Sequence, residues 1–96
     1  MKWLENIILR TADTSKLPLD KLEEIVDSLS APGLIEVALY SNTSIAGDVV
    51  FVLKWDTEKP QAWGSDLSIA VKQELMKQGL VDHSVWTYIK GGRGLS

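Results

Sequence analysis

The chain has 96 residues, 45% of them hydrophobic, and a formal net charge of −3 with both signs mixed along the sequence. This length and composition favour one compact domain with its own core. The absence of cysteine excludes disulfides and thiolate metal sites, and the acidic balance disfavours nucleic acid as a partner.

The first six residues include Glu5 and Asn6, where a signal peptide would need an unbroken apolar stretch. The longest apolar runs are far shorter than the roughly 20 residues that span a bilayer. We therefore expect a cytoplasmic protein that is not inserted in a membrane.

The first half of the chain alternates between a strand-like and a helix-like pattern. Residues 3–11 are rich in β-branched and large apolar side chains and predict a strand, followed by a turn at residues 13–15. From Pro18 to about Leu29, apolar residues recur at helical spacing and predict an amphipathic helix. Proline and glycine at residues 32 and 33 end it.

Residues 34–40 and 48–55 predict two further strands, and the polar and Gly-containing residues 41–47 between them suit a hairpin loop. These two strands should be antiparallel neighbours.

A second helix is predicted over residues 65–78, with Ser65 as its cap and Gly79 as a Schellman-type stop. Residues 81–89 predict the last strand. We expect residues 1–90 to form one domain and the Gly-rich residues 91–96 to be a flexible tail.

The resulting βαββαβ order predicts an α+β fold of the ferredoxin-like type. It has a four-stranded antiparallel sheet with the first and third strands in the middle and both helices on one face. The fold hosts enzymes, ligand binders and RNA binders, so the order of elements predicts no function.

The strands carry apolar residues on both of their faces. In the third strand, Phe51 and Leu53 share one face, while Val50 and Val52 lie on the other. One chain of this length has no further element to cover the second face, and an exposed face of that size is unusual for a monomer. We expect a homodimer in which two sheets pack face to face.

The chain resembles the dimeric α+β barrel superfamily that includes the antibiotic biosynthesis monooxygenase-like proteins. The resemblance rests on the βαββαβ order, on residues 53–56 with Trp63 and Ser65 just beyond them, and on Gly79 and Leu80 before the last strand. It implies a pocket between helices and sheet, with Asn6 and Trp63 at the positions of a functional asparagine and tryptophan. The second helix has no histidine that could ligate haem, and no cofactor is expected.

His83 is the obvious candidate for a general base, because imidazole titrates near neutrality; it could equally hydrogen-bond a neighbour at the start of a strand. Asn6 is the second catalytic candidate. Trp55, Trp63 and Tyr88 could line a pocket for a small aromatic or apolar ligand, although tryptophans often fill cores and interfaces.

The acidic residues lack the spacing of a metal-binding motif, so we expect no metal and interpret them as a solvated rim. These residues are Asp56, Glu58, Asp66 and Asp82.

Two functions of different classes stay open. One is a cofactor-independent monooxygenase-like activity on a small aromatic or apolar molecule, and the other is a non-catalytic ligand-binding or assembly module. An enzyme should direct His83, Asn6 or Tyr88 into a cavity, whereas an assembly domain should fill that space with apolar side chains. An RNA-binding module ranks third, because the acidic balance opposes a phosphate backbone.

Overall fold

The computed structural model describes residues 1–12 and 18–94. The turn predicted at residues 13–15 and the last two residues of the predicted tail lie outside these ranges. The six elements follow the predicted order: β1 (Lys2–Arg10), α1 (Leu19–Ser28), β2 (Leu34–Ser41), β3 (Asp48–Asp56), α2 (Asp66–Leu75) and β4 (Leu80–Thr87).

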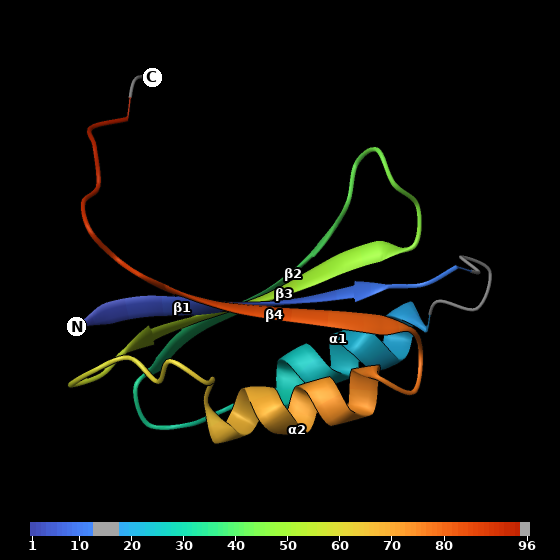
Figure 1. Ribbon diagram of the computed structural model, residues 1–96, viewed down its shortest axis with the longest axis horizontal. Helices are drawn as coiled ribbons and strands as arrows, with labels where there is room; N and C mark the ends of the chain where they lie inside the picture. Colours follow the sequence, from blue (N-terminus) through green and yellow to red (C-terminus); the bar gives the residue numbers. More distant parts are fainter. Residues whose placement is uncertain (13–17, 95–96) are drawn as a thin grey trace.

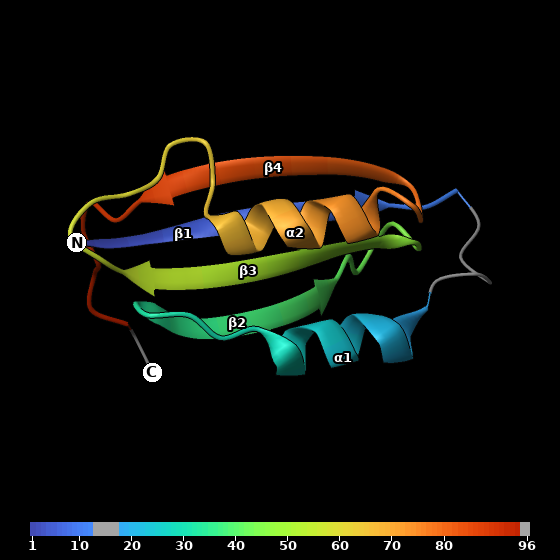
Figure 2. The same ribbon diagram turned by 90° about the horizontal axis from the view of Figure 1, so that it is seen from below.

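The strands form one antiparallel sheet in the order β2-β3-β1-β4, so the first and third strands are central, as predicted. Both helices lie on the same face of this sheet (Figure 1). Seen from the helical side, α2 runs beside β1 and α1 beside β2 (Figure 2). None of the helices in the described part of the chain is long and apolar enough to cross a membrane.

The core lies between the sheet and the helices. Alternate residues of β1 and β3 point into it, because successive side chains of a strand face opposite sides. Trp3 stacks on Trp55 at one end, with ring centroids 5.4 Å apart. The buried apolar residues are Trp3, Ile7, Leu9, Leu22, Val49, Phe51, Leu53, Trp55, Val71 and Leu75.

The end of the second helix differs from the prediction. Helix α2 ends at Leu75, and turns continue the chain through Gln78. Gly79 does not adopt the positive φ of a Schellman stop. A glycine is required at this position for a steric reason instead, because a Cβ atom would lie 2.3 Å from the carbonyl oxygen of Arg10.

The last strand also ends earlier than predicted, at Thr87, so Tyr88 and Ile89 follow it. The segment after β4 leaves the sheet on the side away from the helices (Figure 1). Within residues 88–94, its backbone is tied to the sheet by one hydrogen bond, from the Tyr88 N–H to the Lys2 carbonyl.

The sheet face opposite the helices, here called the open face, has no other element of the described chain above it (Figure 1). Leu4, Ile8, Val50 and Val52 lie on it and are only half-buried. Trp86, directly opposite Leu4 in the β1–β4 pairing, is 58% exposed. The apolar second face predicted from the sequence is therefore present.

Candidate functional site

A fully buried carboxylate lies at the centre of the candidate site. Glu5 belongs to the same face of β1 as Trp3 and Ile7, and its side chain is 0% exposed. Burying an ionised carboxylate is costly unless it is paired and hydrogen-bonded. The neighbours of Glu5 should therefore be donors.

Four donors from three segments surround Glu5. The Trp55 Nε1–H donates to Oε2 over 2.9 Å, and the Ser65 hydroxyl donates to the same oxygen over 2.7 Å. The Ser65 backbone N–H donates to Oε1 over 2.8 Å. His83 Nε2 lies 3.0 Å from Oε1. The carboxylate thus joins β1 to β3, to β4 and to the start of α2.

Burial raises the pKa of Glu5, but hydrogen bonds from Ser65, Ser68 and Trp55 together outweigh it and hold the pKa below the ordinary value. Glu5 is therefore an anion at neutral pH. A carboxylate only accepts hydrogen bonds, so His83 Nε2 must carry a hydrogen and donate it. In the neutral ring this fixes the Nε2–H tautomer and leaves a lone pair on Nδ1.

The loop before α2 closes over this pair. Gly64 has φ +95°, a conformation that favours glycine. A Cβ atom there would lie 2.3 Å from His83 Cε1 and 3.1 Å from Glu5 Oε1. Ser65 then caps the helix by accepting a hydrogen bond from the Ser68 N–H over 3.1 Å. The close approach of Gly64 and the cap together hold the donors of Ser65 at the carboxylate.

The other nitrogen of His83 faces a lysine. Lys72, on α2, has its Nζ 3.4 Å from His83 Nδ1. The His83 side chain is 9% exposed, so part of the ring reaches solvent. An imidazole held by a buried carboxylate on one nitrogen, with its other nitrogen beside a lysine in a hollow, has an arrangement that suits a general base.

A hollow of about 400 Å³, here called the edge hollow, lies beside His83 along β4. Its lining is mixed: Ala62, Trp63, Val81 and Val85 contribute apolar atoms, and Lys72, Asp82, His83 and Ser84 contribute polar ones. Trp63 is 91% exposed. The sequence candidates His83 and Trp63 thus meet at one place, and a small molecule there would contact both.

The structure places the other candidates elsewhere. Asn6 pairs with Val52 and Ser84 and lies on the open face, opposite to His83. The two catalytic candidates are therefore not brought together. Trp55 is buried in the core at 5% exposure, and its N–H is already used by Glu5.

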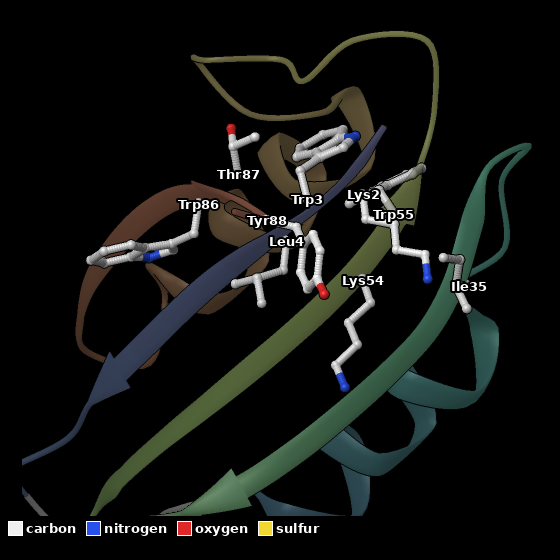
Figure 3. Close-up of a pocket in the computed structure, with 9 residues that line it drawn as sticks. All are labelled: Lys2, Trp3, Leu4, Ile35, Lys54, Trp55, Trp86, Thr87 and Tyr88. Atoms are coloured by element: carbon white, nitrogen blue, oxygen red, sulfur yellow. The ribbon is translucent and has the colours of Figure 1, made fainter. Parts of the chain in front are cut away.

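Tyr88 borders a second hollow of about 410 Å³ on the open face. Figure 3 shows Tyr88 and Leu4 in its middle, Trp86 on one side, and Lys54 and Ile35 on the other. This hollow is mainly apolar and contains no histidine or carboxylate. It can hold an apolar group, but it offers no proton acceptor with a free lone pair near neutrality.

Sequence reasoning missed Glu5 as a site residue, although the signal was present. In residues 3–9 every second residue is Trp3, Glu5, Ile7 or Leu9, so an acidic residue occupies a core-facing position. A charged residue on a buried strand face needs a partner. Lys72 was missed as well, because the sequence predicted only that it belongs to the second helix.

Within residues 1–12 and 18–94, no three His, Asp or Glu side chains gather closely enough to hold a metal ion. The groups that this part of the chain gathers at the edge hollow include the imidazole of His83 and the ammonium of Lys72.

The fold and its site define a class of protein before any relative is considered: a small ferredoxin-like α+β protein. No protein-family model and no curated protein matches the chain. Among solved structures it is similar to Rv0793 from Mycobacterium tuberculosis, with a TM-score of 0.65 and 11% identity. The match covers 97% of this chain and 100% of that one. At this identity the likeness shows the fold alone.

Proposed function

We propose that this protein is a small homodimeric enzyme that uses His83 as a general base on a small aromatic or apolar molecule bound in the edge hollow. The observation that carries the proposal is the contact between His83 Nε2 and the buried Glu5 carboxylate, 3.0 Å long. It orients the ring and leaves Nδ1 as the acceptor at the hollow. Lys72 must turn aside when Nδ1 accepts a proton, and a long surface side chain can do so.

The reaction that the superfamily resemblance favours is oxygenation without a cofactor. His83 would remove a proton from an acidic C–H or O–H group, and the electron-rich anion would then reduce molecular oxygen. For a CH2 group oxidised to a carbonyl, one oxygen atom enters the product and the other leaves as water with the two hydrogens. Dioxygen is the oxidant, and no further reductant is needed.

The homodimer is the second part of the proposal, and the anatomy of the open face supports it. Its middle is mainly apolar, with Leu4, Ile8, Val50 and Val52 around Asn6 in adjacent strands. Charged residues at its border make ion pairs within the chain: Lys54 bonds Glu36 over 3.4 Å, and Arg10 is shared by Asp48 and Asp82. An apolar centre with a polar rim is the usual anatomy of an interface.

Oxygen consumption tests the catalytic proposal. The wild-type protein is assayed with a panel of polycyclic phenols and aromatic ketones that have acidic CH2 groups. His83→Gln should lower kcat by about a hundredfold or more, because a positioned general base contributes that much. Glutamine can still donate to Glu5, so the variant should keep the fold.

Tyr88→Phe is the matched control, because it changes only the hollow on the open face. It should leave turnover unchanged. Full activity in His83→Gln would overturn the role of His83, whereas a large loss in Tyr88→Phe would move the substrate to the open face. Binding of panel compounds without any oxygen uptake would favour the non-catalytic ligand-binding module.

A further inference from the structure

The charge of Lys72 is the feature of the edge hollow that general-base chemistry alone does not explain. No carboxylate of the described residues is within salt-bridge distance of its Nζ, whereas Lys21, Lys54 and Lys77 each have an acidic partner. Among the described residues, the polar side-chain contact of its Nζ is the long one to His83 Nδ1, at 3.4 Å.

Two acidic side chains on the strands beside Lys72 make their contacts with other groups. Asp82, which also borders the hollow, shares Arg10 with Asp48. Glu5 accepts from four donors and is fully buried beneath Gly64, with His83 between it and Lys72. Among the described residues, Lys72 is therefore the cation of the edge hollow that has no direct salt bridge.

This cation shares the hollow with apolar as well as polar groups. Ala62, Val81, Val85 and the exposed indole of Trp63 line it together with Asp82, His83 and Ser84. An ammonium group in one hollow with an indole and aliphatic side chains suits a flat ligand with one anionic oxygen, because the ring covers the apolar part of the wall and the oxygen accepts from the cation. A volume of about 400 Å³ is within the range of small-ligand sites.

We propose that Lys72 selects anionic aromatic molecules, such as aryl carboxylates or acidic phenols, for the edge hollow. The inference deepens the proposed function and rests on it, since it takes the same hollow as the substrate site. An anion on Lys72 would also release His83 Nδ1 from its contact with the lysine and so free the proton acceptor.

Binding of two matched probes tests this inference without any turnover. Naphthalene-2-carboxylate and naphthalene-2-methanol have the same ring system and differ in charge. Calorimetry, with amide chemical shifts of Trp63 and His83 to place the probes, should show the carboxylate binding about tenfold tighter, as one charge-assisted hydrogen bond allows. The preference should shrink at about 1 M NaCl, where the screening length is about 3 Å.

Lys72→Gln should abolish the preference while leaving affinity for the alcohol unchanged, and Lys72→Arg should keep it. Lys77→Gln is the matched control, because Lys77 follows α2 directly and is paired with Glu74. This variant should behave as wild type. Equal binding of both probes to the wild type, or a retained preference in Lys72→Gln, would overturn the inference.

Failure of the proposed function would be seen separately. If His83 is no catalyst, His83→Gln still prefers the carboxylate, and its oxygen uptake equals that of the wild type, whether that uptake is zero or not. If the lysine does not select anions, turnover is lost in His83→Gln and is indifferent to the charge of the substrate.

Discussion

Glu5 has the most demanding environment of any single residue in the described chain. Its carboxylate accepts from Trp55, from Ser65 twice and from His83. In Glu5→Gln one oxygen becomes an NH2 group that faces another donor. The variant should lose about 2–4 kcal/mol of unfolding free energy at pH 7, because a buried network is left unsatisfied. Urea unfolding measures this loss.

The same variant has a defined pH dependence. The pKa of Glu5 is lowered in the folded protein from the ordinary value of 4.5. A carboxylate with a lowered folded pKa stabilises the fold fully above its unfolded pKa, and this contribution is lost as the pH falls through the folded value. The gap between wild type and Glu5→Gln should therefore be constant above about pH 5 and shrink below it.

Glu58→Gln is the control for this pair of measurements, since Glu58 is exposed. Its stability should differ from wild type by no more than about 0.5 kcal/mol. A Glu5→Gln protein as stable as this control would contradict the account of the buried network.

At the scale of elements, one serine determines how α2 begins and where it lies. Ser65 accepts from the Ser68 N–H as the cap and donates to Glu5 through both its hydroxyl and its backbone N–H. Ser65→Ala should cost about 2 kcal/mol, about 1 for the cap and a similar amount for the hydroxyl at the carboxylate.

Thermal or urea unfolding checks this value against Ser28→Ala. The Ser28 hydroxyl is exposed and donates only to the Ile25 carbonyl within α1. We expect an effect within about 0.5 kcal/mol for this control. Similar losses in both variants would mean that the link between α2 and Glu5 adds nothing.

The elements themselves were predictable because their signals are local. The run of β-branched and large apolar residues at 49–55 and the helical spacing of residues 22–29 each depend on residues close in sequence. The role of Gly79 as a helix stop was predicted incorrectly. A glycine is required there because the Arg10 carbonyl of a neighbouring strand lies close by, and not because of the helix itself. Contacts between distant segments leave no such pattern.

The same limit explains why the contacts of the candidate site could not be predicted from the sequence. Glu5 and His83 are 78 residues apart, and their contact exists only because β1 and β4 pair in one register. The sequence could single out His83 as the one histidine, but not which of its nitrogens is held or by which group. Asn6 was the second catalytic candidate. Successive residues of a strand face opposite sides, so the pairing that positions His83 beside Ile7 places Asn6 on the open face.

At the scale of the whole molecule, the fold was predictable but the proposed dimer depends on one uncovered surface. Val52 lies on the open face between Ala38 and Asn6, outside the buried core. A lysine there should leave the folded chain intact yet place an unpaired charge in the proposed interface. Val50→Lys, two residues earlier on the same face of β3, should have the same effect on the dimer.

Light scattering across a dilution series measures this prediction. The wild type should have twice the chain mass of 10.6 kDa at low micromolar concentration, and Val52→Lys should have the mass of one chain. Ile69→Lys is the matched control, because Ile69 lies on α2 and is 41% exposed on the helical side; it should stay dimeric. Far-UV circular dichroism should be the same for all three proteins.

A wild type that is monomeric at every concentration would contradict the dimer. A Val52→Lys protein that stays dimeric would place the interface elsewhere, because a lysine ammonium cannot be buried unpaired in an apolar contact without a large loss of affinity.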